Sequence, residues 1–369
     1  MIYCKKCLIP KSKPYISFTN SVCAACEFHE RKKSLFFNWK EQKKLFDKLI
    51  KKIKKKKNIN YHALVPVSGG KDSISQIARL LEYNIKILAV NVDYGIKTDI
   101  GNYNLSLIPK MGVDLIIFRP EQSDHIKMIK YGFLSYGDPD LASHCLLHAY
   151  PIRVAFNFRI PLVFLGENSA EEYSGEKNSK NKIDHKWFNK YAANSGINIQ
   201  KISKVLNIKR ENKINYELIS NKKLEKINAV FCSSYFFWDS NINLKIAKKY
   251  GFKSLHKNLE GTYRNFHGID EKINRIHQYF KLLKFGYGRA TDHACEDIRN
   301  NFINREMGKK LIKKYESTTI SNYYVNDFTS YIGISKKQFY KTVEKFRNKK
   351  IWKKINGKWK ISYKYNIIK

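Results

Sequence analysis

Residues 67–73 read Val67-Ser68-Gly69-Gly70-Lys71-Asp72-Ser73 and lie between two segments of different pattern. The apolar run 63–67 before them predicts a buried strand, and residues 74–83 after them predict a helix. Paired glycines let the backbone turn tightly and approach phosphate oxygens without a Cβ in the way. The helix that follows would offer unpaired N–H groups and the positive end of its dipole. The stretch therefore predicts a phosphate-binding loop.

The side chains of this loop suit the same purpose. Ser68 and Ser73 add hydroxyl donors, Lys71 adds positive charge, and Asp72 can hold Mg²⁺. The other common phosphate loop, G-x-x-x-x-G-K-[ST], is absent because an aspartate follows Lys71. A second glycine pair, at 286–288, follows a helical pattern and so does not indicate a dinucleotide fingerprint. The alternative is a glycine turn without a nucleotide.

Further apolar runs at 85–93, 114–118 and 161–166 alternate with helical stretches. Such alternation predicts βαβ units and a parallel sheet covered on both faces. Asp93 closes the second run, at the sheet edge where ligands bind, so we expect it near the nucleotide. A strand-end aspartate is also often only a helix cap. Beyond about residue 250 the chain looks helical, at 273–285, 296–315 and 335–348.

Four of the seven cysteines fall in the first 30 residues, as Cys4-x-x-Cys7 and Cys23-x-x-Cys26. Two pairs at this spacing suit one tetrahedral Zn²⁺ ion, and four thiolates leave no open position. We therefore expect a structural zinc ribbon at Cys4, Cys7, Cys23 and Cys26, against the alternative of coincidental pairs.

The chain has 369 residues, with 70 Lys plus Arg against 32 Asp plus Glu, a formal charge of +38. That charge attracts polyanions, but lysines spread along most of the chain also fit ordinary solvated surfaces. The first residues do not resemble a signal peptide, and no apolar run approaches the roughly 20 residues that span a bilayer. We expect a cytoplasmic protein. The expected organisation is a zinc ribbon at 1–30, a basic helical linker at 31–60, a nucleotide-binding α/β domain at 61–250 and a helical region at 251–369.

The pattern S-G-G-x-D-S after the first strand resembles the PP-loop ATP pyrophosphatases, whose fold is the adenine nucleotide alpha hydrolase type. In that superfamily ATP is cleaved between its α- and β-phosphates to adenylate a carbonyl oxygen. Four further stretches narrow the resemblance: 166–168 (GEN), 171–175 (EEYSG), 236–239 (FFWD) and 287–292 (YGRATD). In this order, behind a cysteine ribbon, they resemble the N-acetyl sugar amidotransferases of lipopolysaccharide and flagellin-sugar pathways, including pseudaminic and legionaminic acid derivatives.

This resemblance implies an enzyme that converts an N-acetyl group of a nonulosonic or uronic sugar to an acetamidino group, using ATP and Mg²⁺. It implies a separate glutaminase subunit similar to that of imidazole glycerol phosphate synthase, with its cyclase-like companion, as the ammonia source. The chain itself shows no glutaminase, because Cys145 lacks the glycines of such nucleophiles. The family pattern has a second glycine where this chain has Ser174, beside Gly175.

The resemblance also implies roles for individual residues. For Glu167 and Glu172 the alternative is an ordinary strand-end acid or helix cap. The implied catalytic residues are Lys71, Asp72, Glu167, Glu172 and Arg289. The implied ATP-binding residues are Ser68, Gly69, Gly70, Lys71, Asp72, Ser73, Asp93 and Gly166. The implied substrate-binding residues are Asn168 and Tyr173.

Two other functions fit parts of the sequence. A tRNA-thiolating PP-loop enzyme shares the loop, the ribbon and the basic charge, but sulfur transfer usually needs reactive cysteines near the loop. After zinc is assigned, Cys145, Cys232 and Cys295 remain, and none forms a C-x-x-C pair. A non-catalytic nucleic-acid-binding protein would use the ribbon and a recognition helix that begins near 334–338.

Overall fold

The centre of the protein is a five-stranded sheet in which every pairing is parallel, with the order β5-β4-β3-β6-β7. The computed structural model describes residues 2–34, 37–176, 183–192 and 197–362. The strands are β3 (Ala63–Val67), β4 (Ile87–Val92), β5 (Asp114–Phe118), β6 (Leu162–Leu165) and β7 (Asn228–Phe231). The expected parallel α/β fold is confirmed. Strand β7 was not among the predicted strands.

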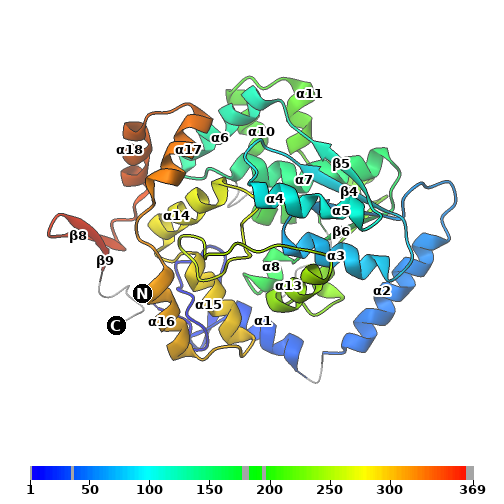
Figure 1. The fold of residues 1–369 in the computed structure, drawn as a ribbon, viewed down its shortest axis with the longest axis horizontal. Coiled ribbons are helices and arrows are strands. Elements are labelled where there is room, and N and C mark those ends of the chain that lie inside the picture. Colours follow the sequence, from blue (N-terminus) through cyan, green and yellow to red (C-terminus); the bar gives the residue numbers. More distant parts are fainter. Residues whose placement is uncertain (1, 35–36, 177–182, 193–196, 363–369) are drawn as a thin grey trace.

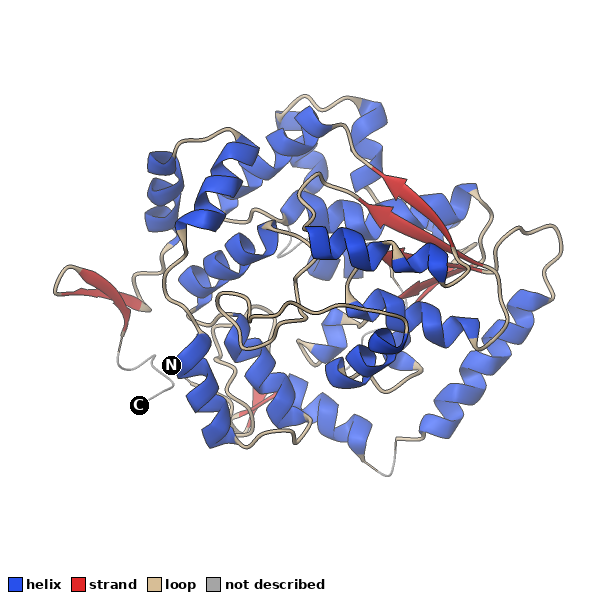
Figure 2. Cartoon of the chain, viewed as in Figure 1, coloured by secondary structure: helices blue, strands red, loops and turns tan. Residues whose placement is uncertain are grey.

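Strand alternation divides the interior into two cores. Ala63, Val65 and Val67 of β3 join one core, and Leu64 joins the other, because successive side chains of a strand point to opposite faces. The first core is closed by α2 (Trp39–Lys54), α3 (Lys71–Leu81), α4 (Asp99–Leu105), α5 (Leu107–Lys110) and α13 (Ser240–Lys249). The second is closed by α6 (Gln122–Tyr136), α7 (Leu141–Asn157) and α10 (Ile199–Val205), so helices cover both faces of the sheet (Figure 2).

The strand order places a crevice beside the predicted phosphate loop. The chain runs from β3 outward to β4 and β5, then crosses to β6 and β7 on the other side of β3. The loops after β3 and β6 therefore leave the sheet in opposite directions, and ligands of open α/β sheets bind at this point. Those two loops carry the glycine turn and Gly166-Glu167-Asn168.

Most of the region after residue 272 packs on the second core. Its elements are α14 (Ile273–Phe285), α15 (Arg289–Arg299), α16 (Arg305–Tyr315), α17 (Asn322–Ile332), α18 (Lys336–Phe346) and the hairpin β8 (Trp352–Ile355) and β9 (Lys358–Ile361). Phe133 of α6 lies against Phe280, Phe328 and Phe339, which come from α14, α17 and α18. These helices thus share a core with the sheet. Residues 363–369 of the predicted helical region lie outside the described part.

Two details of this region differ from the expectation. The single helix predicted at 296–315 is two helices, because Asn301 adopts a φ of +62° and Asn304 caps α16 through the Met307 N–H at 2.8 Å. The hairpin β8–β9 was not predicted. The helix predicted at 273–285 has those bounds, and it ends at Gly286 in the left-handed region.

The cysteine segment packs on α15 and α16, as Figure 1 shows for the blue N-terminal chain beside the yellow α15 and the orange α16. It consists of β1 (Phe18–Thr19), β2 (Val22–Cys23) and α1 (Ala24–Lys33). Leu8 and the four cysteines share a small core with Ala294 of α15 and Ile312 of α16. Of the basic helical linker predicted at 31–60, residues 35–36 lie outside the described part, and α2 starts at Trp39 behind the Asn38 cap.

The glycine that packing requires in this stretch is Gly175, so the serine at 174 can stand where the family pattern has a glycine. Gly175 has a φ of +68°, and a Cβ there would lie 2.2 Å from the carbonyl carbon of Ala24. The close approach of α1 therefore requires glycine at 175. Ser174 is buried but adopts no positive φ, so its backbone does not require glycine.

The other short elements connect these layers. They are α8 (Ser169–Glu172), α9 (His185–Trp187), η1 (Phe188–Ala192), α11 (Arg210–Lys213), η2 (Ile214–Tyr216), α12 (Asn221–Leu224) and η3 (Cys232–Ser234). None of the described helices is both long and apolar enough to cross a lipid bilayer.

Candidate functional site

The glycine turn links β3 to α3, as the sequence predicts. Gly69 has a φ of +94°, and a Cβ there would lie 2.5 Å from the carbonyl oxygen of Gly101, so only glycine fits. Ser68 Oγ accepts from the Gly70 N–H at 3.2 Å, and Ser73 Oγ donates to the Gly70 carbonyl at 2.9 Å. No side chain caps the N-terminus of α3. Its first N–H groups and its dipole are thus available to an anion.

Asp72 accepts hydrogen bonds from two residues, Lys71 and Asn243. Its Oδ2 accepts from Lys71 Nζ at 2.6 Å, and its Oδ1 accepts from Asn243 Nδ2 at 2.9 Å. Asn243 Oδ1 in turn accepts from Ser75 Oγ at 3.1 Å. The Lys71 side chain is only 2% exposed, whereas that of Asp72 is 34% exposed. Lys71 therefore lies behind the loop surface, and Asp72 faces the open space.

That open space is a cleft made of two cavities of about 380 Å³ each, and Asp72 and Glu167 line both. Ser68, Ser73 and Gly166 line the cavity over the loop. Glu167 Oε1 accepts from the Tyr173 hydroxyl at 3.0 Å. Burial, and then the Asp72 carboxylate, raise the pKa of Glu167. Two carboxylates beside a phosphate loop are a donor set that fits Mg²⁺, which prefers carboxylate and phosphate oxygens.

The far wall of the cleft comes from α14 and α15 and contains polar atoms without a partner in the described chain. They are Nε of Arg289, Nε2 of His293 and Oε1 of Gln278. Gln76 Oε1 is a further one, in the cavity over the loop. Buried polar groups are nearly always hydrogen-bonded, so several unpaired atoms around one cleft indicate a place for a polar ligand.

Glu172 and Asn168, which the resemblance implies as site residues, do not line this cleft. Glu172 forms a buried ion pair with Lys32 of α1 at 2.5 Å, and Lys32 also donates to the Ser233 carbonyl at 2.7 Å. Asn168 is fully buried, where it caps α8 through the Ala170 N–H and accepts from Trp187 Nε1 at 3.0 Å. Both hold the loop after β6 in place, and Tyr173 alone of the implied substrate residues faces the cleft.

Asp93 lies at the carboxyl end of β4, one strand away from the glycine turn. Its Oδ1 accepts from the Gly95 N–H at 2.8 Å and its Oδ2 from Arg119 at 2.5 Å. Burial opposes ionisation, but these two bonds keep the pKa of Asp93 below its usual value. Asp93 does not line the two cavities that Asp72 and Glu167 share.

The sequence reasoning missed two supports of the loop. Lys97 Nζ donates to the Ser68 carbonyl at 3.2 Å, and Asn243 orients Asp72. Asn243 lies one turn after Asp239, the last residue of the FFWD stretch and the N-cap of α13. That stretch was recognised, but nothing in it indicated a contact with the loop.

The four ribbon cysteines are arranged as a zinc site requires. Their sulfur atoms all lie within 4.8 Å of one another, with Cys4–Cys26 at 3.8 Å and Cys7–Cys23 at 3.7 Å. Tetrahedral thiolates at about 2.3 Å from Zn²⁺ would lie about 3.8 Å apart. The donor set therefore fits one closed, structural Zn²⁺ site, as the spacing predicts.

The three remaining cysteines do not suit sulfur transfer. Cys145 and Cys232 are fully buried, and burial raises the pKa of Cys232 to about 12. Cys295 is 1% exposed and accepts from the Leu8 N–H at 3.4 Å, beside the ribbon. A thiol that is buried and protonated is a poor nucleophile.

Comparison with known proteins matches residues 260–366 to the family described as LPS biosynthesis protein WbpG-like, C-terminal domain. This confirms, for that segment, the resemblance to the surface-polysaccharide family. The segment includes Arg289, His293 and Gln278 of the cleft wall. No curated protein matches the chain.

Among solved structures, the chain is similar to NMN synthetase from Francisella tularensis, with 13% identity and a TM-score of 0.28 over 60% of this chain and 100% of that one. It is also similar to NAD+ synthetase from Burkholderia pseudomallei, with 13% identity and a TM-score of 0.25 over 62% and 91% of the two chains. Scores this low mark distant similarity, and the PP-loop fold assignment stands on the loop and sheet described above.

Proposed function

We propose that this chain is an ATP-dependent amidotransferase of lipopolysaccharide or flagellin-sugar biosynthesis. It would adenylate the N-acetyl carbonyl oxygen of a nonulosonic or uronic sugar and replace that oxygen with nitrogen from ammonia. One observation carries the proposal: the Asp72–Glu167 carboxylates and the WbpG-like residues Arg289 and His293 face the same cleft. The predicted phosphate loop and the segment that matches the WbpG-like domain thus line the same cleft.

The reaction divides into two steps. In the first, the amide oxygen of the sugar attacks the α-phosphorus of ATP, the α–β bridging bond breaks, and pyrophosphate leaves on the loop. The N–H groups at the start of α3 and the Lys71 charge stabilise that leaving group. Mg²⁺, held by Asp72 and phosphate oxygens, would supply Lewis-acid charge neutralisation. Arg289 faces the cleft with an unpaired N–H and can bind the remaining phosphate.

In the second step ammonia attacks the activated carbon, and AMP leaves with the original oxygen. The attacking nitrogen becomes an ammonium and must lose a proton. Glu167 is placed for this because it lies beside Asp72 in the cleft and its raised pKa makes it a stronger base than an ordinary glutamate. Glu172, paired with Lys32, would support the loop instead.

Ammonia itself needs a source. It is mostly protonated near neutral pH, since amines of this kind have pKa values of about nine to ten, similar to lysine. We propose that a glutaminase subunit similar to that of imidazole glycerol phosphate synthase, with its cyclase-like companion, supplies it.

The test is an end-point assay with ATP, Mg²⁺, ammonium at mildly alkaline pH and a panel of di-N-acetylated nonulosonic and uronic sugars. We expect AMP, pyrophosphate and a sugar in which one oxygen has been replaced by NH, detected by mass spectrometry. AMP formation with bulk tRNA and with no sugar would instead support the thiolating enzyme.

Glu167→Gln should lower kcat for amidation about 10²–10⁴-fold, the usual contribution of a general base. A general base acts only when it is ionised. Wild-type kcat should therefore rise as the pH passes through the raised pKa of Glu167, and this rise should be absent in Glu167→Gln. ATP–pyrophosphate exchange should persist, because adenylation precedes the proton transfer. The neighbouring variant Glu171→Gln, outside the cleft, is the control. An equal fall in exchange and in kcat would assign Glu167 to the first step instead.

A further inference from the structure

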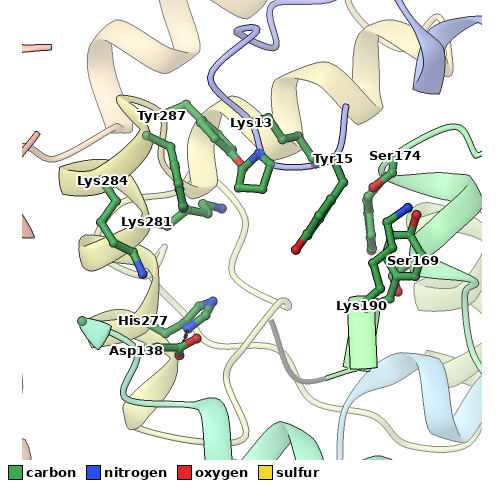
Figure 3. A pocket seen from close by; sticks show the side chains of 15 residues that line it. Lys13, Tyr15, Asp138, Ser169, Ser174, Lys190, His277, Lys281, Lys284 and Tyr287 are labelled. Carbon is green, nitrogen blue, oxygen red and sulfur yellow. Dashed lines mark ion pairs between the residues drawn. The ribbon is translucent and has the colours of Figure 1, made fainter. Parts of the chain in front are cut away.

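A third cavity, of about 180 Å³, opens beside the cleft and is lined by four lysines and four tyrosines (Figure 3). Lys13 and Tyr15 come from the ribbon, Lys281 and Lys284 from α14, and Tyr173 from the segment after α8. Lys13, Lys281 and Tyr173 also line the cleft. The two spaces therefore adjoin, and the ribbon forms part of the wall that they share.

The positive charge of this pocket is not balanced by its own acids. Asp138 is the acid in its lining, and it pairs with His277 at 3.5 Å. Lys281 pairs with Asp292. Within the described residues Lys13 forms no ion pair, and the Asp292 carboxylate acts on it only from a greater distance. The Lys284 ammonium contacts the Tyr136 carbonyl at 3.3 Å and lies 5.5 Å from the centre of the Phe285 ring, and it too forms no ion pair within the described residues.

Burial lowers the pKa of Lys13 and of Lys284. Burial removes the water that would solvate these ammonium groups, and a bound anion would stabilise their charged form instead. These two lysines are therefore suited to an anionic ligand.

The tyrosines give the pocket a surface for a sugar ring. Tyr15 and Tyr173 are 46% and 41% exposed, which is high for rings that line a cavity. Lys13 Nζ lies 5.4 Å from the centre of the Tyr173 ring, so charge and ring face the same space. An exposed aromatic ring next to a cation suits a ligand with one apolar face and one charged group.

The Tyr173 side chain connects the pocket to Glu167 in the cleft. The Tyr173 ring lines the pocket, and its hydroxyl donates to Glu167. The adjoining cleft and pocket thus have two carboxylates at one end, and at the other two lysines that form no ion pair within the described residues. A substrate with its amide at the first end and an anion at the second would match both.

We propose that this pocket binds an oxyanion of the sugar substrate, a carboxylate or a phosphate, and that Lys13 and Lys284 determine the preference for acidic sugars. The inference rests on the proposed function, and it assigns to the ribbon a part in substrate binding that a four-thiolate zinc site alone does not imply.

The experiment measures binding to the full-length protein by calorimetry, without ATP, so that it does not depend on turnover. The probes are N-acetylglucosaminuronic acid for the carboxylate, UDP-N-acetylglucosamine for the phosphate, and neutral N-acetylglucosamine. The variant is Lys13→Met with Lys284→Met. Lys11→Met, an exposed lysine of the same ribbon loop, is the matched control.

We expect the wild type to bind at least one anionic probe at least tenfold more tightly than the neutral sugar, and the double variant to lose that margin. Loss with the uronic acid identifies a carboxylate subsite, and loss with the UDP-sugar alone identifies a phosphate subsite. Equal affinities for all three probes, or a double variant that binds like Lys11→Met, would overturn the inference. Failure of the amidation assay with these affinities intact would overturn only the proposed reaction.

Discussion

Asp72→Asn is expected to lower kcat about 10²–10³-fold, the usual loss when a preorganised electrostatic group is removed from a reacting centre. Asparagine has nearly the shape of aspartate, so the contact with Asn243 can persist while the charge is lost. Without the charge, the site would hold Mg²⁺ poorly and the departing pyrophosphate would be less stabilised. ATP–pyrophosphate exchange in the presence of the sugar measures this step directly.

A second variant separates chemistry from folding. Lys71 is almost completely buried and pairs with Asp72, so Asp72→Asn leaves a buried ammonium without its acid and should lower the melting temperature. The double variant Lys71→Met, Asp72→Asn removes both charges. It should melt closer to wild type and still lack exchange activity. Should Asp72→Asn keep more than a tenth of wild-type exchange, Asp72 has no part in the reaction.

The local sequence pattern was sufficient to predict those elements that are determined by residues close together in the chain. The strand predicted at 114–118 and the helix predicted at 273–285 have those bounds in the structure. The glycine turn could also be predicted, because Gly69 needs its positive φ for reasons visible in the strand–turn–helix pattern. Strand β7 was not predicted, because it directly follows short helical turns that obscure its apolar run.

The rest of the site depends on long-range contacts that no local pattern contains. Asn243 is 171 residues from Asp72, and Lys32 is 140 residues from Glu172. The EEYSG stretch shows why motif reading alone is limited. Within it, α8 directs Glu172 to the ribbon helix and leaves Tyr173 in the cleft. The family pattern marks the whole stretch, but only packing decides which side chain faces a ligand.

Loss of the ribbon metal should have the second large effect, on stability and on substrate affinity together. Structural Zn²⁺ sites of small domains bind with apparent free energies of about 10–16 kcal/mol, which becomes folding free energy. Here the four cysteines lie within the small core that the ribbon shares with Ala294 and Ile312, so loss of the metal would disturb that core. Cys7→Ser should therefore lower the melting temperature by at least several degrees and reduce the zinc content below one ion per chain.

The same variant also tests how the ribbon is connected to the cleft. Lys13 and Tyr15 lie between the two cysteine pairs and line the pocket that we propose binds the substrate oxyanion. Unfolding of the ribbon would therefore remove both side chains from that pocket. The KM for an acidic sugar should then rise much more than the KM for ATP, whose loop lies on β3 and α3. Cys145→Ser is the control, since it also places a hydroxyl at a buried cysteine but outside the ribbon. Equal changes in both KM values would mean that the ribbon stabilises the whole fold and has no direct part in substrate binding.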